Sequence, residues 1–212
     1  MPVEVKICGL STLETLEAAL DAGADFVGLM FFEKSPRNVS LSRAAEMANI
    51  ARGRARIVTV TVDADDALIA AIARHVTPDL IQCHGAETPD RIAAIQALTN
   101  IGAYKVLKVR DANDVARSKA YAGISPFVMY DAVPPEGAVL PGGNGLAFDW
   151  TILKAAGHPF MLAGGLNAGN VAEAIRVTGA DMVDVSSGVE SAPGVKDLAL
   201  IRKFVEAAKR GG

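Results

Sequence analysis

Side chains that can exchange protons gather where apolar runs of this sequence end. The run Glu4–Cys8 (EVKIC) ends in one of only two cysteines in the chain, and a glycine and a predicted helix start follow it. Another run ends in Gln82, Cys83 and His84, and a third ends in Asp131. A thiol, an imidazole and a carboxylate are groups that proteins use as general acids and bases. The positions of these groups therefore indicate proton-transfer chemistry.

Residues suited to binding an anion follow the last two apolar runs. The loop near residue 164 carries Gly164 and Gly165, and the loop near residue 187 carries Ser187 and Gly188. Paired glycines let the backbone approach a ligand, and backbone N–H groups bind phosphate in this part of many barrel enzymes. Either motif alone could equally be a tight turn. Their occurrence in consecutive loops favours a phosphate site.

The elements that position these groups alternate along the chain. Apolar, β-branched runs predict strands over residues 3–8, 25–31, 56–62, 79–83, 103–109, 126–130, 159–163 and 181–185. Amphipathic segments predict helices over residues 12–22, 42–51, 65–75, 88–98, 111–120, 149–156, 168–177 and 196–209. In the first helix, Ser11 and Glu14 form a capping-box pattern and Gly23 can end the helix. Strand–helix pairs of this kind indicate a parallel sheet covered by helices.

Two architectures fit this alternation, a closed (β/α)8 barrel (TIM barrel) and an open, doubly wound sheet. Eight strand–helix pairs favour the barrel, although 212 residues is near its lower size limit. An open sheet that binds dinucleotides carries G-x-G-x-x-G after an early strand. The one candidate, residues 141–148 (PGGNGLAF), comes late and lacks the final glycine. We therefore expect a single-domain barrel over residues 1–212.

Period-two alternation sorts the strand residues by the face they occupy. Lys6 and Cys8 share one face of the first strand, opposite its apolar residues, so we expect both to point into the barrel. Asp184 on the last strand faces inward by the same argument. Because the first and last strands of a closed barrel are neighbours, Lys6 and Asp184 can pair beneath Cys8. The pair could be purely structural or part of a functional site.

The second cysteine and the histidines are harder to assign. Cys83 alternates out of phase with Gln82 and His84, so it is expected to face a helix as an inert thiol. His84 could bind a ligand or hydrogen-bond a turn. A Cys8–Cys83 disulfide is not expected, because the two strands lie far apart around the barrel. Three histidines and two thiols without ligand spacing predict no metal site.

Composition and charge limit the kinds of binding partner and the cellular compartment that we expect for this chain. A net charge of −3 gives no positive field, so nucleic acid is not expected as a partner. No apolar run approaches the length of a membrane helix, and the N-terminus lacks the pattern of a signal peptide. Two cysteines are too few for a disulfide framework. These features predict a cytoplasmic protein without a membrane partner.

With these positions assembled, the sequence resembles the phosphoribosylanthranilate isomerase family, (β/α)8 enzymes of tryptophan biosynthesis. The resemblance runs almost end to end. Its motifs are KICG at 6–9, SPR at 35–37, IQCHG at 81–85, YD at 130–131, GGNGLAFDW at 142–150, AGGLNAGNV at 163–171 and DVSSGVESAPGVKD at 184–197. Cys83 stands where the family usually has leucine, and Asn144 where serine or threonine is common. Neither departure affects a position expected to be catalytic.

The resemblance implies an Amadori rearrangement of N-(5-phosphoribosyl)anthranilate. By analogy, Cys8 is the general base and Asp131 is the general acid that opens the sugar ring. Arg37 is implied as the partner of the substrate carboxylate, and the glycine loops as the phosphate site. No cofactor is implied, because the substrate nitrogen supplies the electron sink. The expected partner is thus a small phosphosugar, and we expect the chain to be a monomer or a homodimer.

These roles set physical requirements. A thiol is mostly protonated at neutral pH, so Lys6 or the helix starting near Ser11 is expected to lower the pKa of Cys8. As an acid, Asp131 needs surroundings that raise its pKa. The segment 131–148 is long and rich in proline and glycine, and we interpret it as an ordered lid over the substrate.

Two other functions remain open at this level. A histidine-pathway aminoaldose isomerase would perform the same reaction class on a substrate with two phosphates. Such enzymes carry a carboxylate at the end of the first strand and two phosphate motifs. This chain instead has Cys8 at the end of the first strand and a single phosphate motif. A non-catalytic phosphosugar-binding regulator would be expected to lose the acid or the base, yet Cys8 and Asp131 are both present.

Overall fold

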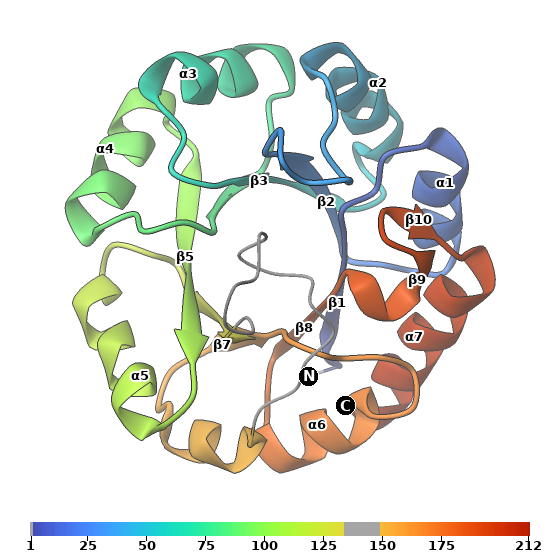
Figure 1. Cartoon of the computed structure of the whole chain (residues 1–212), viewed down its shortest axis with the longest axis vertical. Coiled ribbons are helices and arrows are strands. Elements are labelled where there is room, and N and C mark those ends of the chain that lie inside the picture. Colours follow the sequence, from blue (N-terminus) through green and yellow to red (C-terminus); the bar gives the residue numbers. More distant parts are fainter. Residues whose placement is uncertain (1, 134–148) are drawn as a thin grey trace.

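Eight parallel strands close into a barrel in the computed structural model of this chain, which describes residues 2–133 and 149–212. Helices surround the barrel (Figure 1). The strands, each paired with the next, are β1 (Glu4–Cys8), β2 (Phe26–Phe31), β3 (Arg56–Thr61), β4 (Leu80–Cys83), β5 (Gly102–Val109), β6 (Val128–Ala132), β7 (Phe160–Leu162) and β8 (Met182–Val185). Pairing of β8 with β1 closes the ring. The predicted barrel is confirmed, as are all eight strands, each end lying within two residues of its predicted position.

The helices differ more from the prediction than the strands do. The α-helices are α1 (Leu13–Asp21), α2 (Leu41–Ala51), α3 (Asp66–His75), α4 (Pro89–Thr99), α5 (Ala112–Ala116), α6 (Val171–Thr178) and α7 (Leu198–Gly211). The 3₁₀ helices of the described residues are η1 (Arg117–Tyr121), η2 (Trp150–Ala155) and η3 (Ser187–Val189). The helix predicted over 149–156 is therefore 3₁₀ rather than α, and the one predicted over 111–120 divides into α5 and η1.

The start of α1 corrects the predicted capping box. Thr12, not Ser11, is the N-cap: its backbone is extended and its Oγ1 accepts a hydrogen bond of 3.2 Å from the Thr15 N–H. Glu14 consequently sits one position too early in the helix to complete a capping box with Thr12. The predicted stop is confirmed, because Gly23 follows the C-cap with a φ of +86°, the left-handed conformation that glycine adopts most readily.

Apolar side chains form two layers, as expected for a barrel filled by its own side chains. Outward residues of the strands pack with the helices; Val5 and Ile7 of β1 belong to this layer and are fully buried. A second cluster comprises Phe26, Val58, Tyr104, Val106, Met129, Met161, Ala163 and Met182. Strand alternation assigns it to the barrel interior. Truncating one of the fully buried side chains to alanine would cost about 2–5 kcal/mol. The two layers fix the strand faces, and thereby the inward direction of the polar residues near the strand ends.

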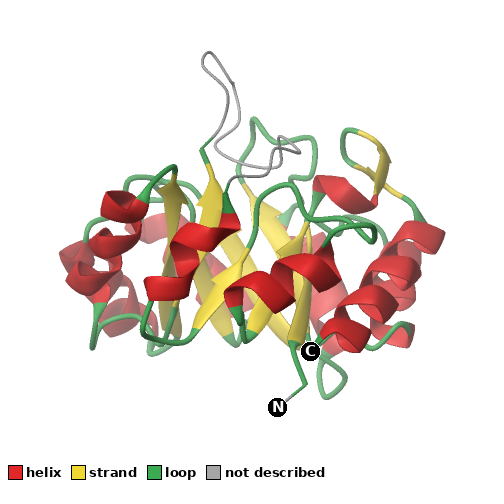
Figure 2. Cartoon of the chain, turned by 90° about the horizontal axis from the view of Figure 1, so that it is seen from below, coloured by secondary structure: helices red, strands yellow, loops and turns green. Residues whose placement is uncertain are grey.

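A short hairpin that the sequence did not predict follows β8. It consists of β9 (Glu190–Ala192) and β10 (Val195–Lys196), which pair antiparallel. Figure 2 shows the hairpin near the end of the barrel toward which the strand arrows point, opposite the chain termini. The hairpin therefore lies at the barrel end where active sites of this fold are found.

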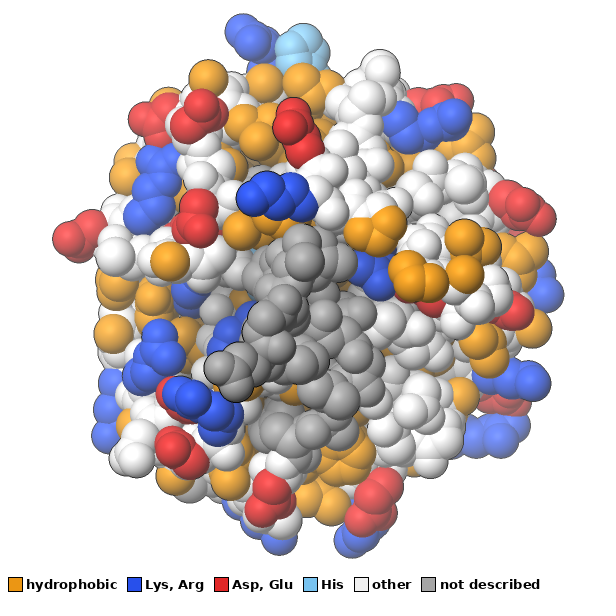
Figure 3. Space-filling model, viewed as in Figure 1, with side chains coloured by type: hydrophobic (Ala, Val, Ile, Leu, Met, Phe, Trp, Pro, Cys, Tyr) orange, Lys and Arg blue, Asp and Glu red, His pale blue; other side chains and the backbone are white. Residues whose placement is uncertain are grey.

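On the side of the molecule drawn in Figure 3, charged side chains of one sign do not form a large patch. Lysine and arginine side chains are interspersed with aspartate and glutamate. In the part of the chain that the structure describes, no helix is long and apolar enough to cross a membrane.

Candidate active site

The first polar group in the barrel is the predicted pair beneath Cys8. Lys6 and Asp184 are register partners on β1 and β8, and Lys6 Nζ lies 2.7 Å from Asp184 Oδ1. Lys6 is fully buried and Asp184 nearly so. Cys8 is the register partner of Gly28 on β2. A Cβ atom on Gly28 would lie 2.9 Å from Cys8 Sγ and 3.2 Å from Lys6 Nζ, so glycine makes room for both side chains. The predicted inward facing and pairing of these residues are confirmed.

The electrostatics of Cys8 differ from the expectation. Burial raises the pKa of the Cys8 thiol; the Lys6 ammonium opposes this effect, but Asp184 adds to it. Lys196 on β10 also lowers the pKa of the thiol, yet the net shift is upward. The prediction that Lys6 or the following helix lowers this pKa overall is therefore wrong for the ligand-free protein. Among the nearby groups, Lys6 has the largest effect on the thiol, and its ion-pair partner Asp184 offsets part of it.

Asp131 at the end of β6 belongs to a second polar group. Its Oδ2 accepts a hydrogen bond of 2.5 Å from Lys108 Nζ and lies 3.3 Å from His84 Nε2. Lys108 is the register partner of Asp131 on β5. Burial alone would raise the pKa of Asp131, but Lys108 and His84 outweigh it and lower the pKa to about 2. The expected rise of this pKa is therefore wrong, because two nearby donors stabilise the carboxylate.

Gln82 and His84 continue this group into the barrel. Gln82 Nε2 lies 3.0 Å from His84 Nδ1, and the Tyr104 hydroxyl donates a 2.8 Å hydrogen bond to Gln82 Oε1. Burial and the nearby Lys108 lower the pKa of His84. Burial raises the pKa of Tyr104, which keeps its hydroxyl proton. The chain of side chains thus fixes the imidazole ring against Lys108 and Asp131.

Arg37 lies in a buried cluster that the sequence did not reveal. Its Nε and Nη2 donate hydrogen bonds of 2.7 and 2.8 Å to the two oxygens of Glu190. Lys196 Nζ lies 2.7 Å from Glu190 Oε1 and donates to the backbone oxygen of Ser186. Gly9 has a φ of +74°, and a Cβ there would lie 2.6 Å from Arg37 Cδ. The glycine of KICG therefore lets the arginine stem cross the end of β1.

Among the residues that the structure describes, the charges in this cluster leave one positive charge uncompensated. Arg37 and Lys196 are cations and Glu190 is their shared carboxylate. The contacts with Glu190 use Nε and Nη2 of Arg37, so Nη1 can donate to a ligand. A bidentate partner also fixes the plane of the guanidinium. The arrangement is compatible with binding a substrate carboxylate, which stays a prediction.

The glycine loops after β7 and β8 touch each other. Gly164 and Gly165 have φ values of +90° and +66°. A Cβ on Gly164 would lie 2.5 Å from the backbone nitrogen of Ala132, and one on Gly188 would lie 1.9 Å from the carbonyl oxygen of Leu166. These close approaches are a structural reason for glycine, rather than a larger residue, at both positions. Ser187 and Gly188 lie in η3, in agreement with the short extra helix considered from the sequence. Phosphate binding by these loops stays a prediction.

Three residues of the site were missed by the sequence reasoning. Lys108 shares an alternation phase with Tyr104 and Val106, so strand periodicity could have assigned it to the interior. Glu190 and Lys196 belong to a hairpin with no periodic signal. Only their place after the last strand connected them with the site.

The remaining predictions concern groups outside the site. Cys83 is fully buried within the outer apolar layer, and burial raises its pKa to about 12, in agreement with an inert thiol. Both cysteines are free. Within residues 2–133 and 149–212, no three ligand-type side chains gather as a metal site would require. The expected lid over 131–148 falls outside the described residues from 134 onward.

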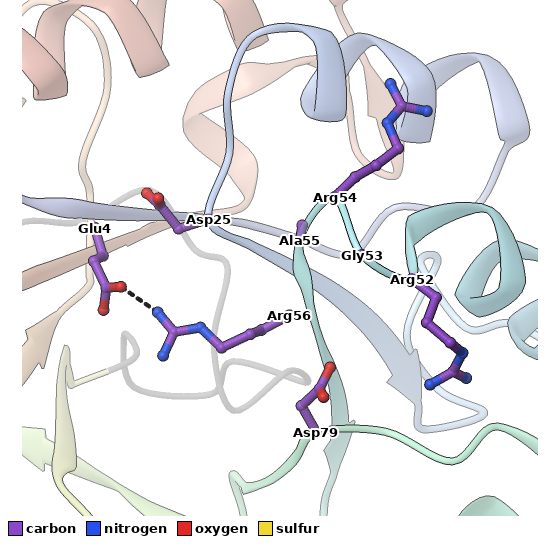
Figure 4. Close-up of a pocket in the computed structure, with 8 residues that line it drawn as sticks. All are labelled: Glu4, Asp25, Arg52, Gly53, Arg54, Ala55, Arg56 and Asp79. Atoms are coloured by element: carbon purple, nitrogen blue, oxygen red, sulfur yellow. Dashed lines mark hydrogen bonds and ion pairs between the residues drawn. The ribbon is translucent and has the colours of Figure 1, made fainter.

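A hollow of about 400 Å³ lies at the opposite end of the barrel (Figure 4). Its arginines have partners: Arg56 pairs with Glu4, and Arg54 lies 2.7 Å from Glu17. The guanidinium of Arg56 also lies 3.7 Å from the centroid of the Phe26 ring. Residues at the amino ends of barrel strands stabilise the fold rather than perform chemistry. We therefore assign the hollow no catalytic role.

The fold and the polar groups at the carboxyl ends of its strands define a (β/α)8-barrel enzyme with titratable side chains on β1 and β6. The chain belongs to the N-(5′-phosphoribosyl)anthranilate (PRA) isomerase family, PRAI, whose sequence pattern matches residues 5–207. A relative from Rhodopseudomonas palustris with the name N-(5′-phosphoribosyl)anthranilate isomerase is 53% identical over 211 residues, which cover 99% of this chain and 97% of the relative.

Solved structures agree with this family. The crystal structure of phosphoribosyl anthranilate isomerase from Thermotoga maritima superposes with a TM-score of 0.88 at 33% identity, covering 98% of this chain and 99% of that one. Another structure of the enzyme holds reduced 1-(o-carboxyphenylamino)-1-deoxyribulose 5-phosphate. It has a TM-score of 0.85 at 31% identity, with 98% of this chain and 99% of that one covered.

Proposed function

We propose that the chain catalyses the Amadori rearrangement of N-(5-phosphoribosyl)anthranilate to 1-(2-carboxyphenylamino)-1-deoxyribulose 5-phosphate in tryptophan biosynthesis. The observation that carries this proposal is the presence of Cys8 and Asp131 at the carboxyl ends of two barrel strands in a chain of this family. That end of the barrel is where enzymes of this fold perform their chemistry.

The reaction needs one proton donor and one proton acceptor. A donor protonates the furanose oxygen as the C1–O bond breaks, and the anthranilate nitrogen supplies electrons to form an iminium ion. The iminium makes the hydrogen on C2 acidic, and Cys8 as thiolate removes it. The resulting enolamine becomes the ketone when C1 takes up a proton and the C2 hydroxyl loses one. Asp131 belongs, with Lys108 and His84, to the polar group from which the ring oxygen would receive its proton.

The substrate nitrogen is the electron sink, so the proposal includes no cofactor and no metal. The partner is a small phosphosugar, bound at its phosphate by the loops that carry Gly164, Gly165, Ser187 and Gly188. Residues 1–212 act as one catalytic domain in the cytoplasm, as a monomer or homodimer. The residues Lys6, Gln82, His84 and Asp184 support the pocket.

One assay tests the proposal. Pure protein is added to freshly generated phosphoribosylanthranilate, and the loss of substrate fluorescence is followed with the product identified by mass and retention. Turnover by the wild-type chain is expected. Binding of substrate without turnover would favour the regulator and overturn the proposed isomerase activity.

Replacing Arg37 by alanine should weaken substrate binding, because the substrate carboxylate loses its cationic partner. The loss of charge-assisted hydrogen bonds is expected to raise KM roughly 10–100-fold. An analogue without the carboxylate should bind wild type and variant almost equally. Arg43→Ala is the control, since Arg43 is an exposed arginine paired with Glu46 on α2. Equal losses for both ligands would remove Arg37 from this role.

A side chain larger than hydrogen in the glycine loops should block the phosphate. Valine at Gly165 or Gly188 is expected to abolish competitive inhibition by inorganic phosphate and to raise KM. Gly188 tolerates no Cβ against Leu166, so circular dichroism must confirm folding first. Gly169→Ala in the same segment is the control. If phosphate inhibits both valine variants as it inhibits wild type, the anion binds elsewhere.

A further inference from the structure

The hairpin after β8 (Figure 2) holds Arg37 through a buried carboxylate, a contact that the roles implied by the sequence do not use. Arg37 Nε and Nη2 donate hydrogen bonds of 2.7 and 2.8 Å to the two oxygens of Glu190 on β9. The N–H of Gly194 in the hairpin turn donates a further bond of 3.2 Å to Glu190 Oε2. The side chains of Arg37 and Glu190 are only 5% and 4% exposed. Because buried polar groups without partners are costly, this bidentate pair restricts the guanidinium to one plane and one position.

Lys196 on β10 is committed to the same cluster. Its Nζ lies 2.7 Å from Glu190 Oε1 and donates hydrogen bonds of 2.9 and 3.2 Å to the backbone oxygen and the hydroxyl of Ser186. An ammonium has three N–H donors, so these contacts use all of them and leave none for a ligand. Lys196 therefore links Glu190 to Ser186, which directly precedes Ser187 and Gly188 of the expected phosphate loop.

Two glycines pack the cluster closely against the rest of the site. Gly194 has a φ of +82°, and a Cβ there would lie 2.9 Å from the backbone oxygen of Pro36, the residue before Arg37. Gly9 directly follows Cys8, and a Cβ there would lie 2.6 Å from Arg37 Cδ. The hairpin turn thus contacts the loop that carries the arginine, and the arginine stem contacts the residue next to the expected base. The orientation of Arg37 therefore sets where its ligand lies relative to Cys8.

The contacts of Arg37 leave one edge of its guanidinium for a ligand. An arginine side chain has five N–H donors in a planar fork. Glu190 accepts one from Nε and one from Nη2, and no residue that the structure describes accepts one from Nη1. The edge formed by Nη1 and Nη2 can therefore bind a carboxylate through two hydrogen bonds, in the plane that Glu190 fixes. Burial alone would raise the pKa of Glu190, but Arg37 and Lys196 outweigh burial and lower it, so Glu190 is ionised at neutral pH.

We propose that Glu190 is a positioning residue, which orients Arg37 so that the substrate carboxylate is held at a fixed place relative to Cys8, and that Lys196 holds Glu190 in this role. The proposal rests on the proposed isomerase activity and on the expected contact of Arg37 with the substrate carboxylate. It makes the hairpin a determinant of specificity for a substrate whose aromatic amine carries a carboxylate.

Two effects of Glu190 on a bound carboxylate oppose each other. Its negative charge repels the ligand, whereas its hydrogen bonds orient the arginine that binds the ligand. Removing Glu190 is therefore expected to change KM by only a few-fold. The loss of orientation has no such compensation in the chemical step, because a displacement of about 1 Å between reacting groups can cost about 10²-fold in rate. The expected signature of positioning is a loss of kcat at a nearly unchanged KM.

A charge-balanced variant, Glu190→Gln combined with Lys196→Met, separates orientation from charge. It removes one negative and one positive charge, so the net charge around Arg37 stays as in the wild type. The glutamine amide keeps one acceptor oxygen for the guanidinium but not two. For phosphoribosylanthranilate, kcat is expected to fall about 10–100-fold, with KM changed by only a few-fold. Steady-state kinetics after circular dichroism has confirmed folding measure both quantities.

A second substrate shows whether the loss depends on the carboxylate. The phosphoribosyl adduct of aniline is generated in the same way and lacks this group, so its turnover should not depend on the orientation of Arg37. Lys196 also lowers the pKa of Cys8, but both substrates share that effect. The ratio of kcat for the anthranilate substrate to kcat for the aniline substrate should therefore fall about tenfold or more in the charge-balanced variant. A ratio within about threefold of the wild-type value would overturn the proposal.

A double-mutant cycle with Arg37 gives a readout that does not need the aniline substrate. If Glu190 acts through Arg37, Glu190→Gln should lower kcat in the wild-type background and change it less than about threefold in Arg37→Ala. Equal losses in both backgrounds would mean that Glu190 acts elsewhere and would overturn the proposal.

Glu190→Asp covers the case in which the charge-balanced variant does not fold. Aspartate keeps the negative charge, but its shorter side chain cannot reach both nitrogens of Arg37 while it holds Lys196. The kcat for phosphoribosylanthranilate should therefore still fall, by about tenfold. A folded Glu190→Asp enzyme with wild-type kcat would show that charge alone is needed and would overturn the positioning role.

Asp25 and Lys209 supply the matched control at the opposite end of the barrel. They form a carboxylate–lysine pair of 2.5 Å, and Asp25 also accepts a hydrogen bond from the Val5 N–H. Asp25→Asn combined with Lys209→Met should lower thermal stability and leave the kcat ratio of the two substrates unchanged. An equal fall of the ratio in this control would mean that lost stability is the cause, and would overturn the proposal.

Wild-type activity separates the two levels of inference. An inactive wild type would refute the proposed isomerase function. An active wild type whose kcat ratio is the same in the charge-balanced variant would refute only the role of Glu190 and Lys196.

Discussion

Replacing Cys8 by serine is expected to lower kcat by about 10²–10⁴, the usual worth of one positioned proton-transfer group. Serine keeps the shape of the side chain, but its hydroxyl is far too weak an acid to supply an anionic base. KM should change much less, because the phosphate and carboxylate contacts do not involve the thiol. Steady-state kinetics after circular dichroism has confirmed folding measure both quantities.

The pH profile of the wild type adds a second test of Cys8. Burial raises its pKa, so the thiolate fraction in the free enzyme increases as pH rises through neutrality and beyond. The kcat/KM of the wild type should therefore still be rising between about pH 7 and pH 9. In Cys8→Ser this rise should disappear.

Cys83 supplies the matched control for both measurements. It is the other free thiol of the chain, is fully buried, and packs with the outer apolar layer. Cys83→Ala should keep turnover within a few-fold and cost a modest amount of stability. A Cys8→Ser enzyme with near wild-type kcat would end the assignment of this cysteine as the base. Complete inactivity of a folded Cys83→Ala protein would mean that Cys83 contributes to catalysis.

The largest effect on stability is expected from Lys6→Met. This substitution leaves the Asp184 carboxylate buried without its cation, and breaking a buried ion pair in this way costs about 3–5 kcal/mol of unfolding free energy. Burial disfavours the Lys6 charge, but Asp184, Cys8 and Tyr104 together outweigh burial and raise the pKa of Lys6, so the pair is ionised in the folded protein. Urea unfolding of wild type and variant measures the difference.

Two further variants isolate the buried charge as the cause. Lys6→Met combined with Asp184→Asn should recover most of the lost unfolding free energy, because no uncompensated charge remains in the barrel. Arg43→Met removes an exposed ion pair on α2 and should cost less than about 1 kcal/mol. If Lys6→Met unfolds within about 1 kcal/mol of wild type, the pair does not carry the energy assigned to it.

Lys6→Met also tests the link between this pair and Cys8. The Lys6 ammonium is the main group that opposes the upward shift of the thiol pKa, and Asp184 works in the other direction. Without the ammonium, the rise of kcat/KM with pH should move to higher pH. The pair would then have both roles that the sequence left open, support of the fold and support of the base.

The amino-acid sequence by itself determined the strands, the barrel and the facing of the residues on β1 and β8. Period-two alternation is a property of an extended backbone, so Lys6 and Cys8 had to share a face wherever the strand packed. Closure of eight parallel strands then made β1 and β8 neighbours, which paired Lys6 with Asp184. The buried position of Cys83 followed from the same alternation. These conclusions needed no contact between distant residues beyond the closure itself.

Local signals were weaker at the helix ends. The capping box was assigned one residue too early, because serine and threonine at positions 11 and 12 are both good N-caps. Which of the two residues is the N-cap depends on which of them has an extended backbone in the segment that follows β1. Likewise, the segment 149–156 has the composition of an α-helix, and only the folded chain shows it as 3₁₀.

Only the tertiary structure decided the electrostatics of the site. Asp131 is ionised because Lys108 on β5 and His84 after β4 lie beside it, and Arg37 is oriented because Glu190 reaches it from a hairpin 153 residues away. The sequence showed each of these residues but not their distances. A pKa depends on burial and on charges a few ångströms away through space, so the ionisation of Asp131 and the position of Lys108 beside it were fixed only when the barrel closed.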